Sequence, residues 1–281
     1  MPGNAEVSAT ETSVAQHYDT GAMLERIKDG LRAAGADPDK PDAADLKPVD
    51  EFHVGGIEAT EALLAPLGVT ARTRVLDIGS GIGGTERHIA GSYGARVTGI
   101  DVTPAFVDTA TALSAMCGLK DQTEYHVASA YDLPVGSHSF DLVTMMHVGM
   151  NLEDKFRLFN EVARVLAPGG RFAVFDYMQI TGEDPEFPVP WASAADHSFV
   201  DHPETYRRAA ARAGLTLVHE RDRHDYAVSF FTRVIAATEE SGPPPVGLHL
   251  IMGDEAQLRY GNVVKASFDG KVGPREMVFR K

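Results

Sequence analysis

The sequence predicts an α/β fold, and two observations support that prediction. Short runs of β-branched and aliphatic residues alternate with helical patterns up to about residue 220, as in a mostly parallel sheet with helices on both faces. Beyond that point a helical apolar stripe precedes a last strand-like run at 276–280, which predicts a helical insertion before an antiparallel final strand. The expected fold is therefore a Rossmann-like, seven-stranded sheet.

The same pattern indicates how the chain is divided. We expect a disordered N-terminus at 1–13, because this stretch is small and polar, and a helical cap with a linker at 14–50. The core domain should occupy 51–220, and 221–270 should form a helical insertion that covers a substrate. Residues 271–281 should complete the sheet as its final strand.

Composition and charge disfavour several classes of protein. The net charge of −14 argues against a nucleic-acid substrate, since affinity for nucleic acids comes largely from lysine and arginine. No apolar run approaches the ~18 residues of a membrane span. Residues 1–6 have neither the basic start nor the apolar core of a signal peptide, so we do not expect secretion. Cys117 is the only cysteine, which excludes an intrachain disulfide and a cysteine-based metal site. We expect a cytoplasmic protein without a metal ion that acts on a small molecule, and the oligomeric state stays open.

The run 74–78 ends in a glycine-rich turn before a helical pattern, which predicts a nucleotide-cofactor site. Gly79, Gly81 and Gly84 match the dinucleotide pattern G-x-G-x-x-G. Asp77 argues against a dinucleotide, because its carboxylate would repel a diphosphate. S-adenosylmethionine (SAM) carries a sulfonium and an ammonium near its methionine end, so an acid at this position favours SAM over a nicotinamide cofactor.

Further strand-like runs end in candidate cofactor contacts. The run 96–101 ends at Asp101, about 20 residues beyond the glycine turn, where a carboxylate usually holds a ribose. The stretch 125–134 offers a small polar turn for the edge of an adenine. The runs 140–146 and 171–176 end at the same predicted edge of the sheet, so the residues that follow them should face the same site.

A series of motifs follows along this core in a fixed order: VLDIGSGIGG, VTGIDVTP, ASAYDLP, SFDLVTMMHV and EVARVLAPGGRFAVFD. The series resembles the class I SAM-dependent methyltransferases. It is most similar to the small-molecule group that includes glycine, sarcosine and dimethylglycine N-methyltransferases and the quinone and tocopherol methyltransferases. The resemblance covers about residues 50–220. It departs from many relatives where Ala128, Ser129 and Ala130 replace Gly-Asp-Ala, so Ser129 in place of the aspartate would accept the hydrogen bond from the adenine amino group.

The strand ends and the resemblance together indicate a set of cofactor-binding residues. The candidates are Asp77, Gly79, Ser80, Gly81, Asp101, Val102, Ser129, Ala130, Met146 and Gly55. Gly55 is included because paired glycines before a helix indicate a close backbone approach, which the resemblance assigns to the carboxylate end of SAM. The expected product of the cofactor is S-adenosyl-L-homocysteine.

The candidate catalytic residues are His147, Tyr18 and Asp176. His147 follows the fourth strand, whose end should flank the transferring methyl group, and is expected to act as a base. The alternative is a structural histidine and a substrate that binds already deprotonated. Tyr18 precedes the amphipathic stretch 22–33, which in the resembled group covers the methionine end of the cofactor. A tyrosine at a helix start can equally pack with its hydroxyl in water.

The candidate substrate-binding residues are His53, Tyr177, Gln179 and Trp191. Tyr177 and Gln179 follow the fifth strand-like run. His53 lies in the loop before a predicted helix, where a histidine bonded to the backbone is the competing interpretation. Trp191 lies in a proline-rich loop, where its ring would either face a cationic substrate or anchor the loop by burial.

The first hypothesis for function is methyl transfer from SAM to a small soluble metabolite, with an amine nitrogen as the preferred acceptor. Methylation of an oxygen or a carbon on a quinone, a phenol or another natural product is the alternative, which the apolar residues of 221–270 would suit. A non-catalytic SAM-binding module is a hypothesis of another class. A nicotinamide dehydrogenase is disfavoured by Asp77, and tight binding of NAD would reverse this order.

Overall fold

The computed structural model describes residue 12 and residues 22–281. Within these residues, seven strands form one sheet in the order β3-β2-β1-β4-β5-β7-β6. The strands are β1 (Arg74–Ile78), β2 (Arg96–Asp101), β3 (Thr123–Val127), β4 (Phe140–Met146), β5 (Leu166–Gln179), β6 (Thr216–Asp222) and β7 (Val272–Arg280). Neighbouring strands from β3 to β5 run parallel, and β7 is antiparallel to both β5 and β6. The predicted Rossmann-like sheet with an antiparallel last strand is confirmed.

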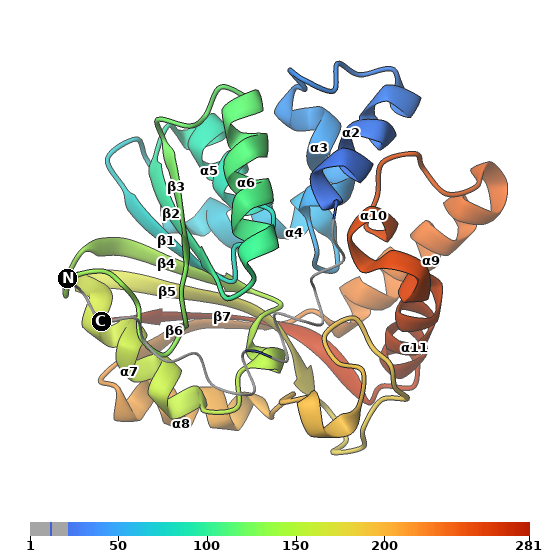
Figure 1. Cartoon of the computed structure of the whole chain (residues 1–281). Helices are drawn as coiled ribbons and strands as arrows, with labels where there is room; N and C mark the ends of the chain where they lie inside the picture. The colour runs from blue at the N-terminus through green and yellow to red at the C-terminus, as the bar shows by residue number, and fades with distance from the viewer. Residues whose placement is uncertain (1–11, 13–21) are drawn as a thin grey trace.

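Helices cover both faces of the sheet, with α5 and α6 on one face and α7 and α8 on the other (Figure 1). The helices of the described residues are α2 (Met23–Ala34), α3 (Ala43–Asp50), α4 (Gly56–Leu64), α5 (Gly84–Tyr93), α6 (Pro104–Met116), α7 (Lys155–Val165), α8 (Pro203–Arg212), α9 (His224–Ser241), α10 (His249–Met252) and α11 (Ala256–Phe268). None of these helices is long and apolar enough to cross a membrane.

Successive residues of the central strands pack against opposite helical layers. In β1, Val75 belongs to the core that includes α4 and α5, whereas Leu76 belongs to the core that includes α7 and α8. Both side chains are fully buried, so β1 forms a continuous apolar run instead of an alternating one. Burial of one such side chain contributes about 1.5–3 kcal/mol. Both faces of the sheet are therefore covered by helices, and the loops at the carboxyl ends of the strands remain available to form a ligand site.

The helical insertion predicted before the last strand is present as α9, α10 and α11, which follow β6 and precede β7 along the chain and lie at one end of the sheet (Figure 1). Phe231 of α9 and Val263 of α11 share a core with Trp191. Ile251 of α10 packs in a separate core with Ile27 of α2. The insertion thus joins the end of the sheet to the N-terminal helices.

Helix α3 lies within 14–50, the stretch for which the sequence predicts a helical cap and a linker. A capping box begins the helix, in which the backbone N–H of Asp42 donates to Oδ2 of Asp45 at 2.9 Å. Leu46 and Val49 are fully buried against neighbouring helices. Pro48 lies inside the helix, and because proline usually marks a helix boundary, its presence conceals α3 from a sequence pattern.

Candidate functional site

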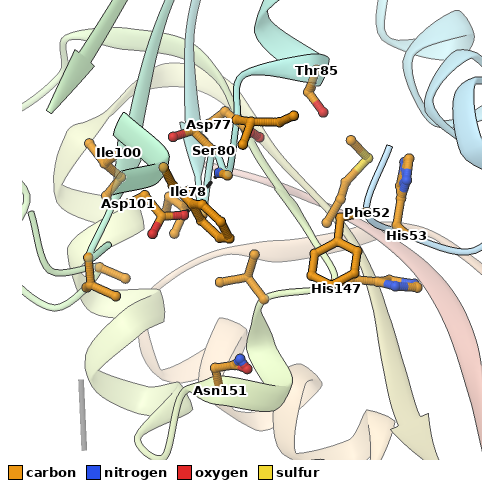
Figure 2. A pocket seen from close by; sticks show the side chains of 18 of the residues that line it. Phe52, His53, Asp77, Ile78, Ser80, Thr85, Ile100, Asp101, His147 and Asn151 are labelled. Carbon is orange, nitrogen blue, oxygen red and sulfur yellow. Dashed lines mark hydrogen bonds between the residues drawn. The ribbon is translucent and has the colours of Figure 1, made fainter. Parts of the chain in front are cut away.

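A cavity opens at the carboxyl ends of β1, β2 and β4, where the order of strands reverses between β1 and β4. The space between protein atoms is about 1050 Å³, with the open mouth included. Figure 2 shows Asp77, Ser80 and Asp101 toward one end of this cavity, with His53 and His147 toward the other. The predicted residues that line it are Asp77, Gly79, Ser80, Gly81, Asp101, Val102, Ala130, Met146, His53 and His147. Ends of several strands thus converge on one cavity.

The glycine-rich turn after β1 lies against the end of β2. The backbone N–H groups of Gly79 and Ser80 both donate to the carbonyl of Ile100, at 2.8 and 2.9 Å. Gly79 has a φ of +77°, and a Cβ at this position would lie 2.2 Å from Cγ2 of Val148. Glycine alone fits here, so this part of the cavity wall consists of backbone.

Asp101 ends β2 and lines the cavity (Figure 2). Its Oδ2 accepts a hydrogen bond from the backbone N–H of Gly81 at 3.0 Å, and its Oδ1 accepts one from that of Thr103 at 2.9 Å. Burial raises the pKa of Asp101, and the two backbone bonds oppose this shift by stabilising the carboxylate. Each oxygen keeps a lone pair, so the carboxylate can accept hydrogen bonds from the two hydroxyls of a ribose.

Asp77 and Glu86 form a pair of buried carboxyl groups behind the glycine turn. Asp77 on β1 accepts a short hydrogen bond from the hydroxyl of Thr144, whereas neither oxygen of Glu86 on α5 accepts a hydrogen bond from a described residue. Burial raises the pKa of Asp77 to about 7. Burial, and then the charge of Asp77, raises the pKa of Glu86 well above its usual range. Of the two carboxyl groups, Glu86 therefore favours its protonated form, and it can share the proton with Asp77.

Glu86 was not predicted from the sequence as part of the site, although Gly99 offered a signal. Gly99 lies within β2, and a Cβ at this position would lie 2.4 Å from Oε1 of Glu86. A glycine inside a strand often marks a close approach of another group. Here it makes room for the buried carboxyl group.

Two predicted cofactor contacts do not line the cavity. Ser129 is buried and its Oγ accepts a hydrogen bond from the backbone N–H of Tyr131 at 3.0 Å, while the neighbouring Ala130 forms the wall. Gly55 lies beneath Tyr226, where a Cβ would be 2.6 Å from the phenolic oxygen. The close approach expected at Gly55 is therefore made by a side chain of α9.

A second cavity adjoins the first, with about 460 Å³ of space including its mouth. Its walls include Phe52, Met150, Tyr177, Trp191, Phe231 and Tyr260. Among the described residues that line it, none is an aspartate, glutamate, lysine or arginine. Phe52, His53 and His147 line both cavities and so mark the place where they meet.

His53 lies at this junction in a hydrogen-bonded chain with Thr60 and Glu51. The Thr60 hydroxyl donates to Oε2 of Glu51 at 2.9 Å, and Nε2 of His53 lies 2.9 Å from the same hydroxyl oxygen. Because the single hydroxyl proton is already donated, Nε2 of His53 is assigned as the protonated nitrogen. Burial lowers the pKa of His53, and the charge of Glu51 opposes that shift.

His147 follows β4 and faces His53 across the junction. Its backbone has a φ of +56°, and its N–H donates to the carbonyl of Phe175 at 2.7 Å. The ring centroids of His147 and His53 are 5.8 Å apart, and that of Tyr177 lies 5.0 Å from His147. Burial, followed by the neighbouring His53, lowers the pKa of His147 well below its usual value. Both imidazoles are therefore neutral at pH 7.

Trp191 is fixed as a wall of the second cavity. Its ring stacks on Tyr177, with centroids 5.4 Å apart and planes at 27°, and its Nε1 donates to Oγ of Ser198 at 2.9 Å. The Tyr177 hydroxyl in turn lies 3.2 Å from Oγ of Ser267. Since one face of the indole is covered by Tyr177, burial anchors the proline-rich loop while the tryptophan still lines the cavity.

Asp176 lines neither cavity, contrary to the expectation that it meets a substrate. It is fully buried, its Oδ1 accepts a hydrogen bond from the backbone N–H of Val148 at 2.9 Å, and its Oδ2 accepts one from the hydroxyl of Tyr206 at 3.1 Å. Asp176 therefore positions the backbone that follows β4. Gln179 also lines neither cavity, and Tyr18 lies outside the described residues.

The first cavity fits SAM better than a cofactor with a diphosphate. Asp77 and Asp101 line it, and no lysine or arginine is among its described lining residues. Such a wall attracts a sulfonium and an ammonium and repels phosphates. The hydroxyl of Ser80 is buried without a hydrogen-bond partner in the described part of the chain, which leaves a donor for a ligand.

Comparisons with known proteins agree with this fit. A family model described as a methyltransferase domain matches residues 76–174. The chloroplastic tocopherol O-methyltransferase of Arabidopsis thaliana is 33% identical over 188 residues, which cover 61% of this chain and 53% of that protein. Methyltransferase GfsG of Streptomyces halstedii is 30% identical over 231 residues, which cover 79% of this chain and 80% of that protein. A solved phosphoethanolamine N-methyltransferase 2 of Haemonchus contortus, bound to phosphomonomethylethanolamine and S-adenosylhomocysteine, is 17% identical with a TM-score of 0.75, over 98% of this chain and 61% of that chain.

The fold and the site define a nucleoside-binding α/β protein with an acidic cofactor cavity. The chain belongs to the class I SAM-dependent methyltransferases, since its match to the Streptomyces relative extends over most of both proteins. The nematode structure adds a likeness of fold alone. The chain spans about half the length of the Arabidopsis relative, so the activity and the acceptor of this protein are matters for proposal.

Proposed function

We propose that this protein transfers the methyl group of SAM to a small molecule held in the second cavity and leaves S-adenosylhomocysteine. The observation behind the proposal is that the cofactor cavity and the aromatic cavity meet at Phe52, His53 and His147. Methyl transfer needs a nucleophile in line with the methyl carbon and the sulfur, in a place from which water is excluded. A junction between two cavities, with buried rings around it, satisfies that need.

The residues of this chain act by holding two reactants in place. SAM, when bound, supplies a methyl group activated by its sulfonium. Asp77 and Asp101 would orient the cofactor from one end, and Tyr177 and Trp191 would enclose the acceptor at the other. The helical insertion 221–270 would cover the acceptor through the aromatic rings that it contributes. Positioning of this kind can lower a barrier by about 7–11 kcal/mol without a covalent intermediate.

The lining of the second cavity favours an apolar acceptor. It carries no charged side chain among the described residues, and an unpaired charge is costly to bury. A carboxylate or phosphate of the acceptor would find no cationic partner inside it. We therefore propose an apolar small molecule that presents an uncharged amine nitrogen or a hydroxyl. The relatives do not decide between these two atoms, because their names include both an O- and an N-methyltransferase.

Two measurements on the purified protein test the proposal. Calorimetric titration should detect binding of S-adenosylhomocysteine and no binding of NAD. Methyl-labelled SAM should then pass its label to at least one member of a panel of alkylphenols, alkyl alcohols and apolar secondary amines. Tight binding of NAD in place of S-adenosylhomocysteine, or binding without transfer to any acceptor, would overturn the proposed enzyme; the second result would indicate a SAM-binding module.

We also propose a cytoplasmic location and no role for nucleic acid. The net charge of −14 supports the absence of a nucleic-acid substrate, and the single cysteine is consistent with a reducing compartment. Fractionation of cells that produce the tagged protein tests the location, and a gel-shift assay at low salt tests the absence of nucleic-acid binding.

A further inference from the structure

His53 lines both cavities where they meet, and one nitrogen of its imidazole is able to take a proton. Nε2–H of His53 donates a hydrogen bond to the hydroxyl oxygen of Thr60, and the Thr60 hydroxyl donates a hydrogen bond to Oε2 of Glu51. Nδ1 of His53 therefore keeps its lone pair, and it is buried without a hydrogen-bond partner in the described part of the chain. Positioning the cofactor and the acceptor does not require an unpaired imidazole nitrogen. We therefore ask what Nδ1 of His53 could do in the reaction.

We propose that Nδ1 of His53 accepts the proton that the acceptor loses, and that Thr60 and Glu51 are positioning residues that fix the tautomer of His53. This inference rests on the proposed methyl transfer. In that step a lone pair of the acceptor oxygen or nitrogen forms the new bond to the methyl carbon. The carbon–sulfur bond breaks with its electron pair onto sulfur, and the acceptor proton moves to Nδ1. One positive charge is lost from the sulfonium and one appears on the imidazolium.

Glu51 lies where it can stabilise that new charge. Its Oε2 is 3.4 Å from Nε2 of His53, and both side chains are buried. Lys47 approaches Oε1 of Glu51 at 3.3 Å and offsets part of the carboxylate's effect. Because burial keeps the pKa of His53 below its usual value, the imidazole is neutral before the reaction and able to accept a proton. The arrangement is that of a general base oriented by a carboxylate through a hydroxyl.

The other titratable groups around the junction are less suited to this role. Nε2 of His147 is also buried without a hydrogen-bond partner, but no carboxylate of the described residues contacts this ring, and burial together with His53 lowers its pKa well below the usual value. Tyr177 and Tyr260 also line the second cavity, and burial raises the pKa of both, so they remain neutral and protonated. Of these groups, His53 alone has both an oriented ring and a nearby negative charge.

The test is the rate of label transfer in a single turnover with saturating SAM, measured from about pH 5.5 to about pH 9. The acceptor is whichever alkylphenol or secondary amine of the panel the wild-type protein methylates fastest. His53→Gln should lower the rate about 100-fold, and Thr60→Val about tenfold, whereas Thr60→Ser should restore it. In Glu51→Gln the fall of the rate toward acid should move to lower pH, because the imidazolium loses its carboxylate.

A matched control is His88→Gln, since His88 is also a buried histidine with a lowered pKa but lines neither cavity. It should keep the wild-type rate. The two Thr60 variants, at a residue that lines neither cavity, should bind S-adenosylhomocysteine within about threefold of the wild-type affinity, which corresponds to less than about 0.7 kcal/mol. His53→Gln and Glu51→Gln, at residues that line the cofactor cavity, are checked for a lost fold by urea unfolding.

The outcomes distinguish this inference from the proposed function. A wild-type protein that labels no acceptor refutes the proposed function. A wild-type protein that labels an acceptor, with His53→Gln equally fast at every pH, refutes the base and leaves the methyltransferase standing. Nitrogen-15 NMR of the imidazole gives a readout independent of turnover. We expect His53 protonated on Nε2 in the wild type and a mixture of tautomers in Thr60→Val; a proton on Nδ1 in the wild type overturns the inference.

Discussion

Replacing Glu86 with glutamine should stabilise the protein, and the gain should grow with pH. Glu86 is fully buried on α5, neither of its oxygens accepts a hydrogen bond from a described residue, and its pKa is raised well above the usual value. In the unfolded chain the same carboxyl loses its proton near pH 4.5. Between these two pKa values the folded state binds one more proton than the unfolded state. The favourable contribution is therefore present at low pH and is lost as the pH rises toward the folded pKa.

The magnitude follows from that single proton. Each pH unit within this window removes about 1.4 kcal/mol from the free energy of unfolding of the wild type. Glutamine has nearly the same shape as glutamate, carries no charge and can donate its amide N–H to Asp77. The advantage of Glu86→Gln over the wild type should therefore increase as the pH rises above the pKa of the unfolded carboxyl, by up to about 1.4 kcal/mol per pH unit.

Urea unfolding at several pH values measures the effect directly. Comparing the variant with the wild type cancels the contributions of His53 and His147, whose lowered pKa values act in the opposite direction by reducing stability toward acid. Glu153→Gln, at an exposed position, is the control and should show no pH-dependent difference from the wild type. If the advantage of Glu86→Gln is the same at every pH, Glu86 does not hold its proton in the folded protein and the description of the pair with Asp77 is wrong.

Three more substitutions test the site and the fold. Gly79→Ala should abolish binding of S-adenosylhomocysteine detectable by calorimetry. The new Cβ would lie 2.2 Å from Val148, and the backbone at this position has a φ of +77°, which alanine rarely adopts. Binding within about tenfold of the wild-type affinity would contradict the assignment of the glycine turn. Asp101→Asn should weaken the same binding by about 10-fold to 100-fold, since a charge-assisted hydrogen bond is worth about 1.5–3 kcal/mol, and an unchanged affinity would remove Asp101 from the cofactor site. Arg87→Met should lower the free energy of unfolding in urea by about 3–5 kcal/mol, because the buried carboxylate of Asp50 loses the guanidinium that it contacts. A loss below about 1 kcal/mol would mean that this ion pair is not needed for stability.

The central strands and the cofactor turn could be predicted because their signals are local. In β1, consecutive buried residues such as Val75 and Leu76 form a short apolar run, and the glycines that follow define the turn within a few positions. The ends of parallel strands share one edge, so Asp77 and Asp101 could be placed at a common cavity before any tertiary contact was known.

Contacts between side chains of different strands and helices could not be predicted from local sequence patterns. Asp176 was predicted at the site because it follows a strand, but its oxygens face Val148 and Tyr206, and only the tertiary packing reveals this. In the sequence, Glu86 is a polar residue in the first turn of a predicted helix and would be expected at the surface. Its burial depends on the space that Gly99 leaves on strand β2.

The sequence predicted His53 as a substrate contact but not the role of base that we propose for it. A lone histidine in a loop is weak evidence for chemistry. What distinguishes it is its contact with Thr60, one turn into the next helix, and the further contact of Thr60 with Glu51 at the end of α3. Because α3 contains a proline and was not predicted as a separate helix, the position of Glu51 could not be derived from periodicity.

The single tryptophan gives this protein an internal optical reporter. Trp191 is the only tryptophan among 281 residues, so nearly all ultraviolet emission excited at the red edge of the absorption band comes from one indole. That indole lines the aromatic cavity and is held against Tyr177. A compound that enters the cavity changes the surroundings of this ring and should therefore alter its emission. Candidate acceptors can therefore be ranked by fluorescence titration before any turnover assay exists.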